Sequence, residues 1–260
     1  MYKAELRRSP KAAFFFYVVD MLGLLLMGIM YKSGIKNTAP IYLIIFAAML
    51  MASYLIDQKN LLTLIGIKGK HIKLTLPAAL IICAAAFALG TAVFDSSIKH
   101  QIYVSAYFLF YISLIEELCY RGFIQNDLFG LKMNRNLTVL IGAVMFSLMH
   151  LPFQMFAKGG GKLSYIVKAV PQLIGTFQFH LLLVIICLLT GDVLIATALH
   201  YAADLFSSYS LTGIIELSLF IAMYVFIVID LIRYFIKKKT GTANPPRDQN
   251  KPPETRDRKQ

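Results

Sequence analysis

The chain has 260 residues, of which 58% are hydrophobic and only 15% are charged, against about 25% charged in an average soluble domain. So little polar surface cannot cover so much apolar mass, which excludes a soluble globular protein. The 26 Lys and Arg residues exceed the 14 Asp and Glu residues, and they stand at the ends of apolar segments. This placement is typical of a membrane protein rather than of a nucleic-acid-binding protein.

The apolar segments predict an all-α, polytopic membrane protein with a buried polar site in its helix core. A membrane-spanning helix needs about 20 mostly apolar residues. Eight segments are candidates: 13–31, 39–56, 74–94, 102–130, 137–157, 165–190, 193–209 and 212–236. Basic residues precede the first segment, as in a signal peptide, but no small-residue cleavage site follows it. We therefore interpret it as a retained helix.

Residues 1–236 are expected to form one transmembrane domain, and residues 237–260 a disordered basic tail rich in proline and charge. Lys and Arg are more frequent in the segments that lie inside if both termini are cytoplasmic, so this orientation is favoured. We expect a multi-pass protein of the cell membrane, with the lipid bilayer as its surroundings.

Ionisable side chains inside the apolar segments are the candidates for function, because a charge at the bilayer centre costs about 3 kcal/mol on insertion scales. They are Asp20, Glu116, Glu117, Arg121, His150, His180, His200, Asp204, Glu216, Asp230 and Arg233.

Five of these have simpler interpretations than a site. Asp230 and Arg233 are three residues apart near a helix end and form a pair whose side chains reach the interface. Glu216 lies near the other end of the same segment and is expected to be hydrated. Asp20 is interpreted as one partner of an interhelical hydrogen bond, with a role in the site as the alternative. His180 is interpreted as a packed, hydrogen-bonded histidine.

The remaining six ionisable residues fall into three short motifs. In the first, Glu117 and Arg121 are i,i+4 neighbours on a helix and can form an ion pair. Glu116 points about 100° away from Glu117, so its carboxylate is free of that pair. This division predicts a structural ion pair beside a working carboxylate.

The second and third motifs each place two side chains on one helix face. Phe146 and His150 are four residues apart, as are His200 and Asp204. If the first two motif helices form a hairpin with its tip near Met133, Glu116 lies 17 positions before the tip and His150 lies 17 positions after it. Both are then about 25 Å from the tip, which predicts that they are level.

One Glu, two His and one Asp at the same depth predict hydrolysis. Glu116 could take a proton from water that His150 helps to hold, while His200 and Asp204 stabilise an oxyanion or hold the polarised carbonyl. Alternatively, His150, His200 and a carboxylate (Glu116 or Asp204) could bind Zn²⁺ and leave a position open for water. From spacing alone, an ion or proton pathway and purely structural pairing also remain open.

The three motifs in this order resemble those of the CPBP family (CAAX proteases and bacteriocin-processing enzymes), also called the Abi family. The family pattern is EExxxR, then FxxxH, then HxxxN or HxxxD, on successive buried helices. The matching residues here are Glu116, Glu117, Arg121, Phe146, His150, His200 and Asp204. The match extends from about Ser113 to Asp204. The resemblance implies an all-α fold of eight helices and intramembrane hydrolysis of a peptide bond.

The resemblance also implies roles for the site residues. Glu116 would activate water with the help of His150, and His200 and Asp204 would act on the oxyanion side. An ionised Asp cannot donate a hydrogen bond as Asn can. Asp204 therefore is protonated, orients His200 or binds a cation. We favour a metal-free glutamate mechanism over one that uses a divalent metal such as zinc.

The predicted function is therefore that of an intramembrane endopeptidase acting on a peptide or membrane-protein substrate, without nucleic acid as a partner. Prenylated CAAX proteins, secreted or signalling peptides and bacteriocin precursors are equally compatible with the sequence. Some members of the family are immunity factors or scaffolds, so a non-catalytic membrane adaptor or bacteriocin-immunity protein is the first alternative. An ion or proton pathway is the second.

Overall fold

The computed structural model describes residues 10–36, 38–57, 67, 71–93, 97–131, 135–159 and 162–207, and for residues 39 and 52–57 the backbone only. The predicted span 212–236, the predicted tail 237–260, and Glu216, Asp230 and Arg233 lie outside the described residues. The predicted orientation of the two termini stays a prediction for the same reason.

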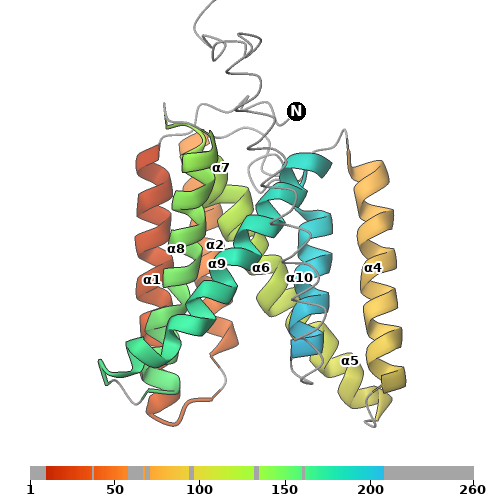
Figure 1. Ribbon diagram of the computed structural model, residues 1–260, viewed down its shortest axis with the longest axis horizontal. Coiled ribbons are helices and arrows are strands. Elements are labelled where there is room, and N and C mark those ends of the chain that lie inside the picture. The colour runs from red at the N-terminus through yellow and green to blue at the C-terminus, as the bar shows by residue number, and fades with distance from the viewer. Residues whose placement is uncertain are drawn as a thin grey trace, which may run out of the picture. The chain divides into compact units, whose positions relative to one another are not determined.

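All regular structure in the described ranges is helical, as predicted (Figure 1). The helices are α1 (Pro10–Lys32), α2 (Ala39–Asp57), α4 (Ile72–Val93), α5 (Ile98–Ala106), η1 (Tyr107–Ser113), α6 (Leu114–Glu117), η2 (Leu118–Ile124), α7 (Gln125–Leu128), α8 (Arg135–Ala157), α9 (Tyr165–Thr190) and α10 (Leu194–Ser207). The five segments from α5 to α7 follow one another without a break, and we call this stretch the site helix (Ile98–Leu128).

Five of the described helices are long and apolar enough to cross a membrane: Pro10–Lys32, Ile72–Val93, Ile98–Leu128, Arg135–Ala157 and Tyr165–Thr190. The predicted second and seventh spans are also helical where the structure describes them, as α2 and α10, but they are not among these five. The predicted count of eight spans is therefore not confirmed.

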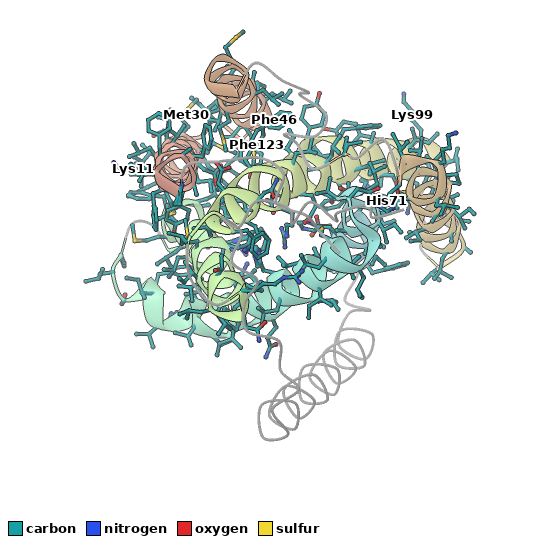
Figure 2. All side chains as sticks on the ribbon, turned by 90° about the horizontal axis from the view of Figure 1, so that it is seen from above. Lys11, Met30, Phe46, His71, Lys99 and Phe123 are labelled. Carbon is teal, nitrogen blue, oxygen red and sulfur yellow. The ribbon has the colours of Figure 1, made fainter. Side chains whose placement is uncertain are left out.

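The site helix lies between two groups of helices. Its η2 part packs against α1 and α8, while its η1 and α6 parts pack against α10. Seen from above, the site helix crosses the middle of the view, with α1 and α2 on one side and the helices of the α9–α10 region on the other (Figure 2). Side chains of the site helix therefore reach partners on both sides.

The site helix is not a regular α-helix. Two π-helical segments, Tyr107–Ser113 and Leu118–Ile124, flank a single α-helical turn, Leu114–Glu117. The backbone N–H of Leu114 donates to the carbonyl of Leu109, five residues earlier. Because π-turns change the direction of the side chains that follow them, they are frequent at functional sites. Nothing in the sequence pattern predicted these two segments.

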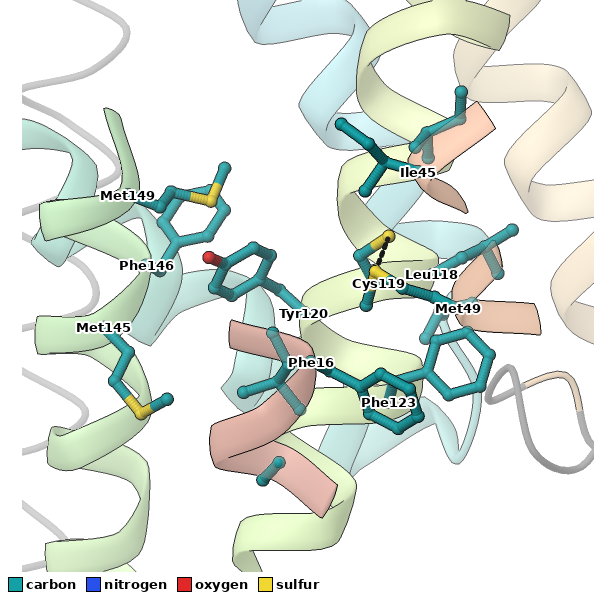
Figure 3. Close-up of a cluster of buried hydrophobic side chains, with 14 of the residues drawn as sticks. Phe16, Ile45, Met49, Leu118, Cys119, Tyr120, Phe123, Met145, Phe146 and Met149 are labelled. Atoms are coloured by element: carbon teal, nitrogen blue, oxygen red, sulfur yellow. Dashed lines mark hydrogen bonds between the residues drawn. The ribbon is translucent and has the colours of Figure 1, made fainter. Parts of the chain in front are cut away.

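A cluster of buried apolar side chains fixes the η2 part of the site helix against its neighbours (Figure 3). The rings of Phe16 on α1 and Phe123 on η2 lie 5.7 Å apart between centroids. The sulfur of Cys119 lies 3.8 Å from that of Met49 on α2. On the opposite side, the rings of Tyr120 and Phe146 meet edge to face at 5.0 Å. The cluster therefore sets the rotation of the site helix and hence the direction of its polar residues.

Helix α10 begins at a turn that also holds it to α4. Gly191 has a positive φ of 86° and ends α9 in the left-handed conformation. The carboxylate of Asp192 then accepts a hydrogen bond from the backbone N–H of Leu194 at 3.0 Å, and it also accepts one from the hydroxyl of Thr75 on α4. The start of the helix that carries the third motif is thereby fixed.

Two buried polar residues form hydrogen bonds between helices, as predicted. Asp20 on α1 accepts a hydrogen bond from the hydroxyl of Tyr120 at 3.0 Å. His180 on α9 lies with its Nε2 atom 3.2 Å from the Oε1 atom of Gln125 on α7. Both are completely buried, so these bonds connect helices inside the protein.

The pair of Gln125 and His180 depends on a glycine of α8. A Cβ atom at Gly142 would lie 1.9 Å from Oε1 of Gln125, so Gly142→Ala is expected to displace this amide and lower the free energy of unfolding by about 1–3 kcal/mol. Thermal unfolding in detergent measures the change. Gly175→Ala on α9 is the matched control, because nothing lies within 4 Å of its Cβ. Equal stability of the two variants would contradict the expectation.

Candidate active site

The structure brings the free carboxylate of the first motif to the two motif histidines. Glu116, on the short turn α6, has its Oε2 atom 4.0 Å from Nε2 of His150 on α8 and 3.8 Å from Nε2 of His200 on α10. The predicted common depth of Glu116 and His150 is thus confirmed. Both separations are too long for a direct hydrogen bond but suit a water molecule bonded to the atoms on either side.

The backbone determines which nitrogen of His150 faces Glu116. The Nδ1 atom of His150 lies 2.9 Å from the carbonyl oxygen of Phe146, one turn earlier on α8, and a carbonyl can only accept. Nδ1 therefore carries the hydrogen, and Nε2 of the neutral ring presents a lone pair toward Glu116. The ring of Phe146 lies against the imidazole edge to face, with 4.9 Å between centroids, and holds its plane.

Carboxylates lie against both ring nitrogens of His200. Nδ1 is 2.7 Å from Oε1 of Glu117 and donates to it. Nε2 is 3.5 Å from Oδ2 of Asp204, one turn later on α10, in addition to its approach to Glu116. The ring also meets Phe179 of α9 edge to face, with 5.0 Å between centroids. The position of His200 is therefore fixed from three sides.

The ion pair predicted inside the first motif is present. Nη1 of Arg121 lies 2.8 Å from Oε1 of Glu117, and the two side chains are 1% and 0% exposed. The guanidinium also lies over the ring of Phe146, 4.2 Å from its centroid. Because Glu117 contacts both Arg121 and His200, it links the ion pair to a motif histidine. Helix spacing could not reveal this link, since the two residues lie on different helices.

Exposure separates the reactive side chains from the supporting ones. The side chains of Glu116, His150 and Asp204 are 12%, 20% and 25% exposed. By contrast, the side chains of Glu117 and Arg121 are buried. A substrate could therefore reach Glu116 and His150 without opening the ion pair.

The predicted alternative is a metal site formed by the same side chains. Among the described residues, no group of three or more His, Cys, Asp and Glu side chains is placed to hold a metal ion. The steps proposed below use only the side chains of this chain.

One polar contact of Asp204 in this site was not predicted from the sequence. The hydroxyl of Ser113, the last residue of η1, donates to Oδ2 of Asp204 at 3.2 Å. Ser113 is completely buried and lies three residues before Glu116 on the site helix. A serine in an apolar helix gives no signal of its own, because serine hydroxyls there commonly bond their own backbone.

Comparison with protein families bears on the segment that carries all three motifs. Residues 98–206 match the family described as type II CAAX prenyl endopeptidase Rce1-like. The matched segment is thus similar to the CAAX proteases. The match begins with the site helix and ends in α10, so it contains Glu116, His150, His200 and Asp204, and it confirms the family indicated by the motifs. It covers less than half of the chain. Comparisons with curated proteins and with solved structures give no match.

Proposed function

We propose that the chain is an intramembrane endopeptidase in which Glu116 activates the attacking water. The observation that carries this proposal is the position of the Glu116 carboxylate, 4.0 Å and 3.8 Å from the Nε2 atoms of two histidines on two other helices. A water between Glu116 and His150 would meet two acceptors, which is what a nucleophilic water needs in order to lose a proton. The family match supports the reaction class.

In the first step, the water oxygen forms a bond to the scissile carbonyl carbon while one water proton moves to Glu116. His150 orients this water through the lone pair on Nε2. In the second step, the tetrahedral intermediate collapses, the C–N bond breaks, and Glu116 returns the proton to the leaving nitrogen. The carboxylate is then restored for the next turnover, so the reaction consumes one water and no other reactant.

We assign to His200 the role of stabilising the oxyanion of the intermediate. With carboxylates against both of its nitrogens, this ring is the group suited to donate to a developing negative charge through Nε2. Asp204 acts by holding His200 and not by donating itself, since a carboxylate only accepts. Glu117, Arg121 and Phe146 support the site by holding the two histidines.

The substrate class proposed here is a membrane-associated protein or peptide. The described helices long and apolar enough to cross a membrane include those of Glu116 and His150, so a substrate must approach these two residues from within or beside a bilayer. The family name makes prenylated CAAX peptides the first probe to try.

The test is cleavage of a farnesylated CAAX peptide and of a panel of membrane peptides by the purified full chain in liposomes, with and without a strong chelator. The wild-type chain is expected to cleave at least one peptide, with less than about a twofold change on chelation. Loss of cleavage on chelation, restored by zinc, would overturn the metal-free mechanism. No cleavage of any peptide would favour the adaptor, whereas a proton or ion flux across the liposomes would favour the pathway.

A further inference from the structure

Two hydrogen bonds connect the site helix to α10 with the same spacing on both helices. Ser113 donates to Asp204 at 3.2 Å, and His200 donates to Glu117 at 2.7 Å. Ser113 and Glu117 are four residues apart, as are His200 and Asp204. The first residue of one helix pairs with the last of the other, so the two bonds form an antiparallel pair. We call these two bonds the polar ladder.

The spacing of the polar ladder allows only one register between the two helices. Residues four apart lie on one helix face and are about 6 Å apart along the axis. If α10 moved by one turn along the site helix, Asp204 or His200 would meet the wrong partner and the other would have none. Apolar packing alone does not discriminate in this way, because it has no direction.

Glu116 lies on the site helix between the two residues of the polar ladder. Its partner Nε2 atom belongs to His200, which is itself part of the ladder, and that atom also lies 3.5 Å from Oδ2 of Asp204. A shift of α10 therefore changes the 3.8 Å separation between Glu116 and His200 directly. The turn at Asp192 fixes the start of α10 and the Glu117 bond holds it at His200, but neither bond involves the following turn, which carries Asp204.

Ser113 supplies a further contact, at Asp204, one turn beyond His200 on α10. Its hydroxyl donates across to another helix, whereas the hydroxyl of Thr197 on α10 donates to the carbonyl of Val193, four residues earlier in the chain, at 2.9 Å. Ser113 is completely buried, so no water competes for its bond, while Asp204 at the other end is 25% exposed. The buried hydroxyl of Ser113 thus restrains Asp204, which is more exposed than Glu117, the other acidic residue of the polar ladder.

We propose that Ser113 is a positioning residue that, with Glu117, sets the register of α10 and thereby the separation of His200 from Glu116. Its effect on the rate rests on the proposed function, but the existence of the polar ladder does not. The two can therefore be tested separately.

The first test is a double-mutant cycle in thermal unfolding of the full chain in detergent, with Ser113→Ala, Asp204→Ala and the double variant. If the ladder bond exists, the two single changes are non-additive, and Ser113→Ala lowers the melting temperature less in the Asp204→Ala background than in the wild type. Additive changes would overturn the proposal. If Ser113→Ala does not accumulate, Ser113→Cys takes its place in the cycle, because a thiol is only a weak donor.

The second test measures kcat and KM of the same variants on the best peptide found for the wild-type chain. Ser113→Ala is expected to lower kcat about tenfold and to leave KM within about twofold, because Ser113 does not contact substrate. In the Asp204→Ala background, Ser113→Ala should change kcat by less than about twofold. The matched control is Ser147→Ala, which removes a hydroxyl bond from α8 to the carbonyl of Leu173 on α9 at 2.6 Å.

A kcat of Ser113→Ala equal to that of Ser147→Ala would overturn the positioning role. Cleavage by Glu116→Gln at the wild-type rate would overturn the proposed function, and the unfolding cycle would still decide whether the polar ladder exists. The two failures are thus distinguishable.

Discussion

Replacing Glu116 by Gln is expected to lower kcat for peptide cleavage by about 10³-fold while the protein still accumulates in the membrane. Gln has nearly the same shape as Glu but cannot take a proton from water, so the change removes one chemical step and little packing. Glu116 is 12% exposed and takes no part in the ion pair of Glu117 and Arg121, so its replacement leaves no buried charge unpaired. The measurement is kcat of the purified variant, with its melting temperature beside that of the wild type.

The matched control is the same chemical change at another buried carboxylate. Asp20 on α1 accepts a hydrogen bond from Tyr120, and Asn at this position still offers an oxygen for that bond. Asp20→Asn is therefore expected to keep kcat within about tenfold of the wild type. If Asp20→Asn and Glu116→Gln lose activity equally, the loss reflects buried charge in general and the special role of Glu116 is contradicted.

Breaking the ion pair of Glu117 and Arg121 from one side is expected to give the largest loss of stability. Arg121→Met leaves the carboxylate of Glu117 fully buried with His200 as its remaining partner, at a cost of about 3–5 kcal/mol in the free energy of unfolding. The change also removes the guanidinium that lies over the ring of Phe146. Thermal unfolding of the variant in detergent, with its accumulation in the membrane, measures the effect.

The double variant Glu117→Leu/Arg121→Met separates the two functions of this pair. Replacing both charges by apolar side chains of similar size should restore most of the stability lost by Arg121→Met. Cleavage should remain absent, because His200 has lost the carboxylate that holds its Nδ1 atom. A double variant that is stable and active would show that Glu117 only balances Arg121 and does not position His200.

The sequence was sufficient to predict the parts of the site that depend on helix geometry. Glu117 and Arg121 pair because residues four apart on a helix are neighbours. Glu116 and His150 meet, as their equal separations in residues from Met133 along the sequence predicted. His180 and Asp20 form hydrogen bonds to residues on other helices, because burying a polar group without such a bond costs free energy.

Other features could not be predicted because they depend on rotation between helices. The π-turns around Glu116 and Glu117 alter the direction of their side chains by an amount that no periodicity reveals. Hence neither the contact of Glu117 with His200 nor that of Ser113 with Asp204 was predicted.

The central claim is that Glu116 is the group that makes this chain a peptidase. The most direct measurement is comparative profiling of peptides from cells that carry the wild-type chain, Glu116→Gln or Asp20→Asn at equal levels. The account predicts at least one cleaved product that is present with the wild type and with Asp20→Asn and is lost with Glu116→Gln. The same products in equal amounts from wild type and Glu116→Gln would contradict it.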